Sequence, residues 1–103
     1  MPLTDADIAF AIELFSPLGA ITHRRMMGGL AIYHDGQIFA SLDRDGRVYL
    51  KAKGDFAAAL AAEGADQFVA GPGKTMGYWS LPEAALEDPD AACAWAQRAL
   101  QAL

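Results

Sequence analysis

The sequence predicts an α+β domain in which an antiparallel meander sheet is packed by helices, in the order α-β-β-β-α-β-β-α. Apolar and other side chains alternate in three successive runs, which is the pattern of strands. Asp-Gly pairs separate these runs, and segments at both ends of the chain carry apolar residues at helical spacing. A globular chain of 103 residues buries roughly 65% of its unfolded surface, so we expect one domain over residues 1–103.

The first helix is predicted to begin after Thr4, whose side chain suits an N-cap. Asp5 and Asp7 would lie in its first turn, where the positive end of the helix dipole favours acidic side chains. Pro17 ends the helix, because proline cannot continue the hydrogen-bond ladder. The face expected to lie on the sheet consists of apolar residues three or four apart, Ile8, Ala11, Ile12 and Phe15.

Three strands are predicted between residues 30 and 53. Period-two alternation places successive side chains on opposite faces of a sheet. Phe39 and Ser41 are therefore expected on the face opposite to Ala40 and Leu42. Residues 22–25 are expected only to lead into this meander.

Asp35-Gly36 and Asp45-Gly46 stand between the alternating runs. Both residue types tolerate the positive φ of tight type I′ or bulged turns, so each pair predicts a β-hairpin. After the meander, a short helix is expected from an N-cap at Asp55 to a stop at Gly64. Its buried side chains would be Phe56 and Leu60.

Two more strands, residues 67–70 and 74–80, are predicted on either side of the turn Gly71-Pro72-Gly73. A connector over residues 82–86 leads to the last helix, with Asp88 as N-cap and Pro89 at its first position. One face of this helix is apolar and consists of Ala92, Trp95, Ala96, Ala99, Leu100 and Leu103.

Composition excludes several classes of protein. Hydrophobic residues make up 53% of the chain and charged residues 20%, which is too apolar for a disordered tail. No apolar run reaches the length of a membrane span, and the first ten residues lack the features of a secretion signal. We therefore expect a soluble, cytoplasmic protein that does not bind membranes. The formal net charge of −5 repels a phosphate backbone, so we expect no specific DNA binding by the chain alone.

Three features bear on catalysis, cofactors and metals. Residues 71–75, GPGKT, are like the end of a phosphate loop, but Phe68 occupies the position where that motif needs its first glycine. His23 and His34 lack a metal-ligand spacing, and a single cysteine excludes a multi-cysteine zinc site. Nothing in the sequence supplies the electropositive setting of a reactive thiol, so Cys93 is interpreted as structural. We predict no catalysis, no cofactor and no metal.

Several short motifs along the chain can be compared with a known family. They are Arg25, Met26-Met27-Gly28-Gly29, Tyr33, Asp35-Gly36, Phe39-Ala40, Val48-Tyr49-Leu50-Lys51, Phe68, Tyr78-Trp79, Leu81-Pro82 and Trp95-Ala96. In these residues the chain resembles the N-terminal domain of the TfoX/Sxy family, regulators of competence genes for natural transformation. It departs from the family at Met27, where members often have an aromatic residue. The resemblance implies the element order given above, similar to the secretion-chaperone-like fold, and a role in transcription regulation.

Candidate partner-binding residues follow from the meander and from the motifs. Tyr49 and Lys51 share one sheet face, which is either a basic-aromatic contact surface or a solvated face. Residues 26–29 are read either as an adaptable methionine surface or as a bulge with a close backbone approach. Tyr78 and Trp79 point to opposite faces, one to the core and one to an interface. The full candidate set is Arg25, Met26, Met27, Gly28, Gly29, Tyr33, Asp35, Tyr49, Lys51, Tyr78 and Trp79.

We interpret the chain as a non-enzymatic regulatory or protein-interaction domain whose protein partner is unknown. A five-stranded sheet covered by helices on one side leaves its other face exposed, and we expect a homodimer to cover that face. A small-molecule-binding domain is an alternative, recognisable by a ligand-sized apolar pocket with converging polar groups. A nucleic-acid-associated module is another, recognisable by a salt-dependent affinity for DNA.

Overall fold

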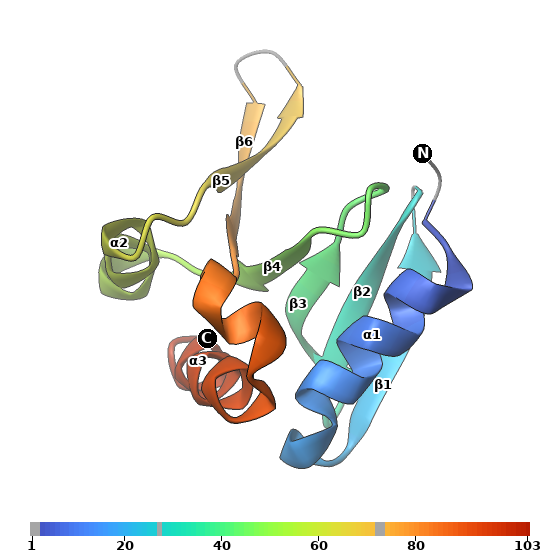
Figure 1. Ribbon diagram of the computed structural model, residues 1–103. Helices are drawn as coiled ribbons and strands as arrows, with labels where there is room; N and C mark the ends of the chain where they lie inside the picture. The colour runs from blue at the N-terminus through green and yellow to red at the C-terminus, as the bar shows by residue number, and fades with distance from the viewer. Residues whose placement is uncertain (1–2, 27, 72–73) are drawn as a thin grey trace.

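The computed structural model describes residues 3–26, 28–71 and 74–103 (Figure 1). Its elements are, in chain order, α1 Asp5–Phe15, the 3-10 turn η1 Ser16–Leu18, β1 Ile21–Met26, β2 Gly29–His34, β3 Gln37–Leu42, β4 Val48–Lys51, α2 Gly54–Ala62, β5 Gln67–Gly71, β6 Lys74–Ser80, the 3-10 turn η2 Glu83–Glu87 and α3 Pro89–Gln101. The α+β class and the predicted order are confirmed, with one strand, β1, added before the meander.

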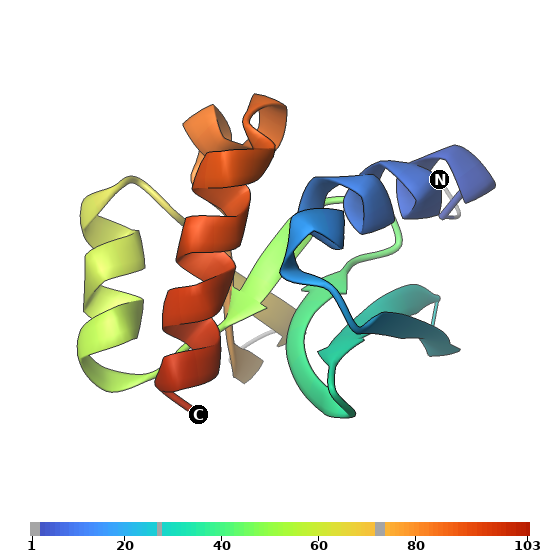
Figure 2. The same ribbon diagram turned by 90° about the horizontal axis from the view of Figure 1, so that it is seen from below.

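The strands form one antiparallel sheet of six, in the order β1-β2-β3-β4-β6-β5. The expectation of five was wrong, because residues 22–25 pair along β2, from Ile21 opposite His34 to Met26 opposite Gly29. The side chains of residues 22–25 are exposed, so β1 lacks the apolar face by which alternation reveals a strand. The three α-helices lie together on one side of the sheet, and none of the helices formed by the described residues lies over the other side (Figure 2).

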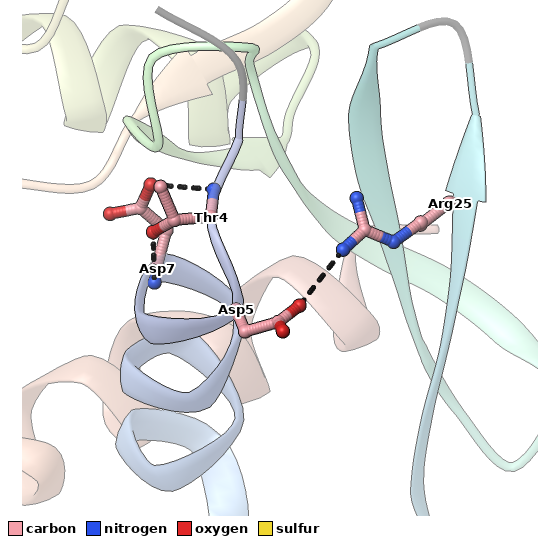
Figure 3. Close-up of polar contacts among 4 residues, drawn as sticks. All are labelled: Thr4, Asp5, Asp7 and Arg25. Carbon is pink, nitrogen blue, oxygen red and sulfur yellow. Dashed lines mark hydrogen bonds and ion pairs between the residues drawn. The ribbon is translucent and has the colours of Figure 1, made fainter.

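The first helix begins as predicted, after Thr4. The Thr4 N–H donates to Oδ2 of Asp7 and the Asp7 N–H donates to Oγ1 of Thr4, each at 3.1 Å, which is a capping box (Figure 3). Ile8 and Ile12 of the predicted stripe are half-buried at its margin, while Leu14 is buried although the predicted stripe omitted it. The buried side of the helix consists of Ala11, Leu14 and Phe15.

Both Asp-Gly pairs lie in hairpin turns, as predicted. Asp35 and Gly36 have φ values of 50° and 81°, the positive values that a type I′ turn requires. In the second turn the Gly46 N–H donates to the carbonyl oxygen of Asp43 at 3.0 Å. Oδ1 of Asp43 also accepts the Arg47 N–H at 2.9 Å, so this side chain braces the turn.

Phe39 departs from the alternation of its strand. Two consecutive residues of β2 lie opposite Ala40 and Ile38, so Phe39 between them is an extra residue, which makes a β-bulge. The expectation that Phe39 shares a face with Ser41 was therefore wrong. Phe39 is fully buried, and its ring packs against Phe15 of α1.

The prediction that Asp55 caps the second helix was wrong. The backbone is extended at Lys53 and turns into α2 at Gly54, and the Lys53 side chain makes no capping hydrogen bond. Asp55 lies in the first turn, where the helix dipole still favours its charge. The buried side chains of α2 are Phe56 and Leu60, as predicted.

The two strands predicted before the last helix are confirmed as β5 and β6. The second of them, β6, pairs with β4, with Ser80 opposite Tyr49, so β5 is at the edge of the sheet. Pro72 and Gly73 of the predicted turn between them lie outside the described residues. The predicted connector contains the 3-10 turn η2.

The last helix is capped as predicted. Oδ1 of Asp88 accepts the backbone N–H groups of Asp90 at 3.1 Å and Ala91 at 3.2 Å. Leu103 was expected on the packed face, but α3 ends at Gln101 and Leu103 is 39% exposed. The buried side of α3 consists of Ala92, Cys93, Ala96 and Ala99.

Candidate functional site on the open face of the sheet

The open face is the side of the sheet that carries no helix. Directly paired residues of antiparallel strands point to the same side, so strand register assigns each side chain to a face. Leu30, Ile32 and Leu50 belong to the core beneath the helices. The strand neighbours of these core residues, and the residues paired with those neighbours, therefore lie on the open face. They include Thr22, Arg24, Ala31, Tyr33, Ile38, Ser41, Tyr49, Lys51, Tyr78 and Ser80.

Two half-buried tyrosines, Tyr33 and Tyr78, lie near each other on this face. Tyr78 lies directly opposite the exposed Lys51 across the β4–β6 pair. Burial raises the pKa of Tyr78 above its usual value, and the nearby Tyr33 hydroxyl adds a smaller increase. Tyr78 therefore remains neutral at physiological pH, and both rings offer apolar surface on a face that also carries Lys51.

Tyr49 lies on the expected face, but only 6% of it is exposed. Its ring centroid is 5.2 Å from that of Phe68 in β5, and the Arg47 guanidinium carbon is 5.6 Å from the ring. The Tyr49 hydroxyl donates to Oδ2 of Asp43 at 3.3 Å. Burial, followed by the charge of Asp43, raises the pKa of Tyr49. Tyr49 is therefore a packed, structural residue of the open face and offers little surface to a partner.

The arginines near the meander differ in whether they form ion pairs. Arg25 reaches from β1 to Asp5 at the start of α1, with 3.1 Å between Nη2 and Oδ1 (Figure 3). Nη2 of Arg47 is 2.8 Å from Oδ2 of Asp66, and this hydrogen bond raises the pKa of the guanidinium. Within residues 3–26, 28–71 and 74–103, Arg24 and Lys51 on the open face form no ion pair.

The glycine pair of residues 28–29 has a structural explanation. A Cβ on Gly29 would collide with the carbonyl oxygen of Leu42, so β2 and β3 need glycine there. The backbone of Met26 pairs with Gly29 at the end of β1. The structure does not describe the Met26 side chain or Met27, so the predicted methionine surface lies outside the described residues.

Other candidate residues lie away from the open face. Trp79 is opposite Leu50 on the helix-covered side and packs half-buried against the core, which confirms that Tyr78 and Trp79 point to opposite faces. Asp35 stands in a hairpin turn, with Oδ2 3.8 Å from Nδ1 of His34. Of the candidate set, the register therefore brings together Tyr33, Tyr49, Lys51 and Tyr78.

The family model described as the TfoX N-terminal domain matches residues 13–103. The chain belongs to the TfoX N-terminal domain family. The match runs from the last turn of α1 to the end of the sequence and so includes the whole sheet, α2 and α3. The resemblance seen in the sequence motifs is thus confirmed. Among curated proteins, no sequence matches this chain.

Sequence reasoning missed two contributors to the open face of this TfoX N-terminal domain. Arg24 is placed there by β1, an edge strand whose polar pattern concealed it. Phe68 of β5 packs against Tyr49 of β4 across β6, the strand that lies between them. The signals available for Phe68 were its aromatic character within a predicted strand and its place among the family motifs, and neither indicated a contact with Tyr49.

Reactive groups of this TfoX N-terminal domain lie elsewhere. Cys93 is buried, and its S–H donates to the carbonyl oxygen of Leu14 at 3.5 Å. Burial raises the pKa of the Cys93 thiol, so it stays protonated at neutral pH. In the part of the chain that the structure describes, no group of three or more His, Cys, Asp or Glu side chains could hold a metal ion. No helix among these residues combines the length and apolar character needed to cross a membrane.

Proposed function

We propose that this TfoX N-terminal domain is a non-enzymatic regulatory domain that binds another protein through the open face of its sheet. The observation that carries the proposal is that half-buried aromatic rings lie beside cations that form no ion pair with the described residues. Tyr78, for example, is opposite Lys51, on the side of the sheet away from the helices (Figure 2). Tyr33 and Tyr78 supply apolar area with few rotatable bonds, and aromatic side chains are enriched in protein interfaces. Lys51 and Arg24 supply charge that can steer an acidic partner.

Family membership supports a proposal for the regulated process. The TfoX/Sxy family consists of regulators of competence genes for natural transformation. We therefore propose that this chain contributes to such regulation in the cytoplasm. Its role would be to bind a protein partner that acts on the regulated genes.

Two observations favour protein contact over catalysis. The candidate nucleophile, Cys93, is protonated and buried beneath α1, whereas His23 and His34 lie in strands β1 and β2. Asp43 and Asp66 are engaged by Tyr49 and Arg47 respectively. These carboxylates brace the sheet and its last hairpin.

Direct DNA recognition is disfavoured by the charges. The chain has a formal net charge of −5, and Arg25 and Arg47 are held by Asp5 and Asp66. We therefore expect no specific binding to duplex DNA at physiological salt. Fluorescence anisotropy with labelled duplexes measures this. Sequence-dependent binding tighter than about 1 μM would replace the proposal by DNA recognition, since non-specific binding lies near 10⁻⁴ to 10⁻⁶ M.

A second copy of the chain is the first partner to test. A two-fold dimer would set Tyr33 and Tyr78 of one protomer against the same residues of the other. Sedimentation across a concentration series would then show a dimer that Tyr78→Lys weakens. A monomer that persists at about 100 μM excludes any dimer tighter than that, and the partner is then a different protein.

Site-specific photo-crosslinking in cells tests the surface itself. A photoreactive phenylalanine analogue at position 78 should form a discrete protein adduct. The matched control is the same analogue at position 10, because Phe10 is 47% exposed but lies on α1, on the helix-covered side. Adducts at position 10 and none at position 78 would show that the open face is not the contact surface.

A further inference from the structure

A cavity opens where strands β3 and β4 separate. The two strands pair only between residues 40–42 and 48–50, and the bulge at Phe39 ends their ladder. Beyond this point Ile38 of β3 and Ala52, just past β4, both line a space of about 280 Å³. The C-terminal end of α3 closes another side, next to the segment that leads from β4 to α2 (Figure 2).

The wall of this cavity is mostly apolar. Ile38 is half-buried and Ala52 is 5% exposed, and Leu103 contributes an aliphatic side chain at the mouth. Gly77 of β6 lines the cavity with backbone only, and its carbonyl oxygen already accepts the Ala52 N–H at 2.9 Å. A bound molecule would therefore meet hydrocarbon over most of its surface.

The charge at the mouth is positive. Lys51 and Lys53 both line the cavity, no carboxylate side chain does, and neither lysine has an ion pair among the residues that the structure describes. The C-terminal end of α3 is equivalent to roughly half a negative charge. The α-carboxylate of Leu103, the last residue of the sequence, also lies at the mouth and adds one full negative charge. The two lysine charges exceed the sum of these negative charges, so the cavity favours an anionic group at its mouth.

The backbone and the volume of the site favour a small carboxylate over a phosphate. A phosphate is usually held by a helix N-terminus or a nest of backbone N–H groups, and the end of α3 at this cavity is a C-terminus. The volume lies just below the range of about 300–1,000 Å³ for drug-sized ligands. An apolar body with one small anionic head fits both the wall and the charge.

We infer that this cavity is a binding site for small apolar carboxylates, with the carboxylate between Lys51 and Lys53 and the hydrocarbon against Ile38 and Ala52. Lys51 belongs to the open face as well as to the cavity. An occupied cavity would therefore neutralise a cation of the open face. The binding site itself does not depend on the protein contact proposed above.

A titration of the full chain with sodium hexanoate tests the site. Amide ¹H–¹⁵N NMR spectra should show shifts centred on Ala52, Gly77 and Leu103, with a Kd at or below about 1 mM for a ligand of this size. Hexanamide has the same hydrocarbon without the charge and should bind at least fivefold more weakly. Equal affinities for the two molecules, or shifts that do not centre on the cavity, would overturn the assignment.

Two variants test the charge. Lys51→Gln combined with Lys53→Gln should weaken hexanoate binding by about tenfold, since an exposed charge pair accounts for up to about fivefold. Arg24→Gln removes an exposed cation of the same sheet outside the cavity and should leave the Kd unchanged. An equal effect of the two changes would show only general attraction to a positive surface.

Gly77→Val tests the shape. A Cβ at position 77 has no heavy atom nearer than 3.6 Å, so the first atom of a side chain fits there. Because Gly77 lines the cavity, the larger valine side chain is expected to occupy part of it. Hexanoate binding should be lost while the NMR spectrum of the folded chain is retained. Unchanged affinity in this variant would place the ligand elsewhere. If Gly77→Val does not fold, Gly77→Ala provides the same test with a smaller expected loss.

Discussion

The ring of Phe39 meets the ring of Phe15 edge-on, with centroids 5.3 Å apart and planes inclined at 84°. Both side chains are fully buried. Edge-to-face aromatic pairs contribute about 0.5–1.5 kcal/mol beyond the area that they bury. The β-bulge that turns Phe39 toward the helices thus fixes the end of α1 against β3.

Replacement of Phe39 by alanine should therefore be among the most damaging changes in the chain. Truncation of a buried phenylalanine costs about 3–5 kcal/mol, because it removes apolar contacts and leaves a cavity. Urea denaturation measures the loss. Phe10→Ala on the same helix as Phe15 is the control, and its 47% exposure predicts less than about 1 kcal/mol. Similar losses in both variants would contradict the packing described for Phe39.

Gly29→Ala should destabilise the sheet by about 1–3 kcal/mol or more, because the added methyl group overlaps the Leu42 carbonyl oxygen. Gly77→Ala is the matched control, since a Cβ there makes only an ordinary contact, 3.6 Å from the Ala52 carbonyl oxygen. The urea midpoints of the two variants give the comparison. A Gly29→Ala protein as stable as the control would mean that β2 and β3 are less closely apposed than the structure has them.

Trp95 holds the last helix to the second one. Its ring centroid is 6.2 Å from that of Phe56 in α2, and the Arg98 guanidinium carbon lies 4.7 Å from the Trp95 ring. A double-mutant cycle with Trp95→Ala and Phe56→Ala should give a coupling energy of about 0.5–1.5 kcal/mol. Strictly additive losses would show that the two rings stabilise the fold independently.

The Cys93 thiol should make stability depend on pH. Burial raises its pKa in the folded state, so the unfolded chain ionises first, from about pH 8.5. The stability that comes from the neutral thiol is complete below that pH and is lost as pH rises through the folded-state pKa. Tyr49 and Tyr78 add a similar loss at higher pH, because their pKa values are also raised.

Urea titrations from pH 7 to 10 on the native chain and on Cys93→Ala isolate the thiol contribution as the difference between the two curves. The native chain should lose more stability than the variant over this range. Alkylation of the native chain by iodoacetamide should also become fast only in urea. Rapid alkylation without urea, or parallel pH curves, would contradict the buried thiol.

Local chemistry explains what the sequence could predict. Thr4 and Asp88 cap their helices with side chains next to the turn that they stabilise, and Asp35-Gly36 adopts the φ values that its residue types favour. Alternation also placed Tyr78 and Trp79 on opposite faces. Such features depend on residues a few positions apart, so they can be recognised without the tertiary structure.

The remaining features depend on distant parts of the chain. Phe39 leaves its alternating face because Phe15, in the first helix, offers an aromatic partner across the core. Tyr49 packs against Phe68, a residue that follows α2 in the sequence. The alternation within one strand cannot predict a contact with a residue so distant in the chain. As a result, the sequence placed Tyr49 and Lys51 on the correct face but could not distinguish the buried side chain from the exposed one.

The strand order also has a consequence for the folding pathway. Strands β1 to β4 each pair with their neighbour in sequence, so short loops close every step. The β4–β6 pair instead joins Tyr49 to Ser80 across the whole of α2 and β5. Contacts between distant residues form late, because the entropy of loop closure must be overcome first. Pulsed hydrogen exchange during refolding should therefore protect the meander amides before those of β6, and the open face would be completed only at the last stage of folding.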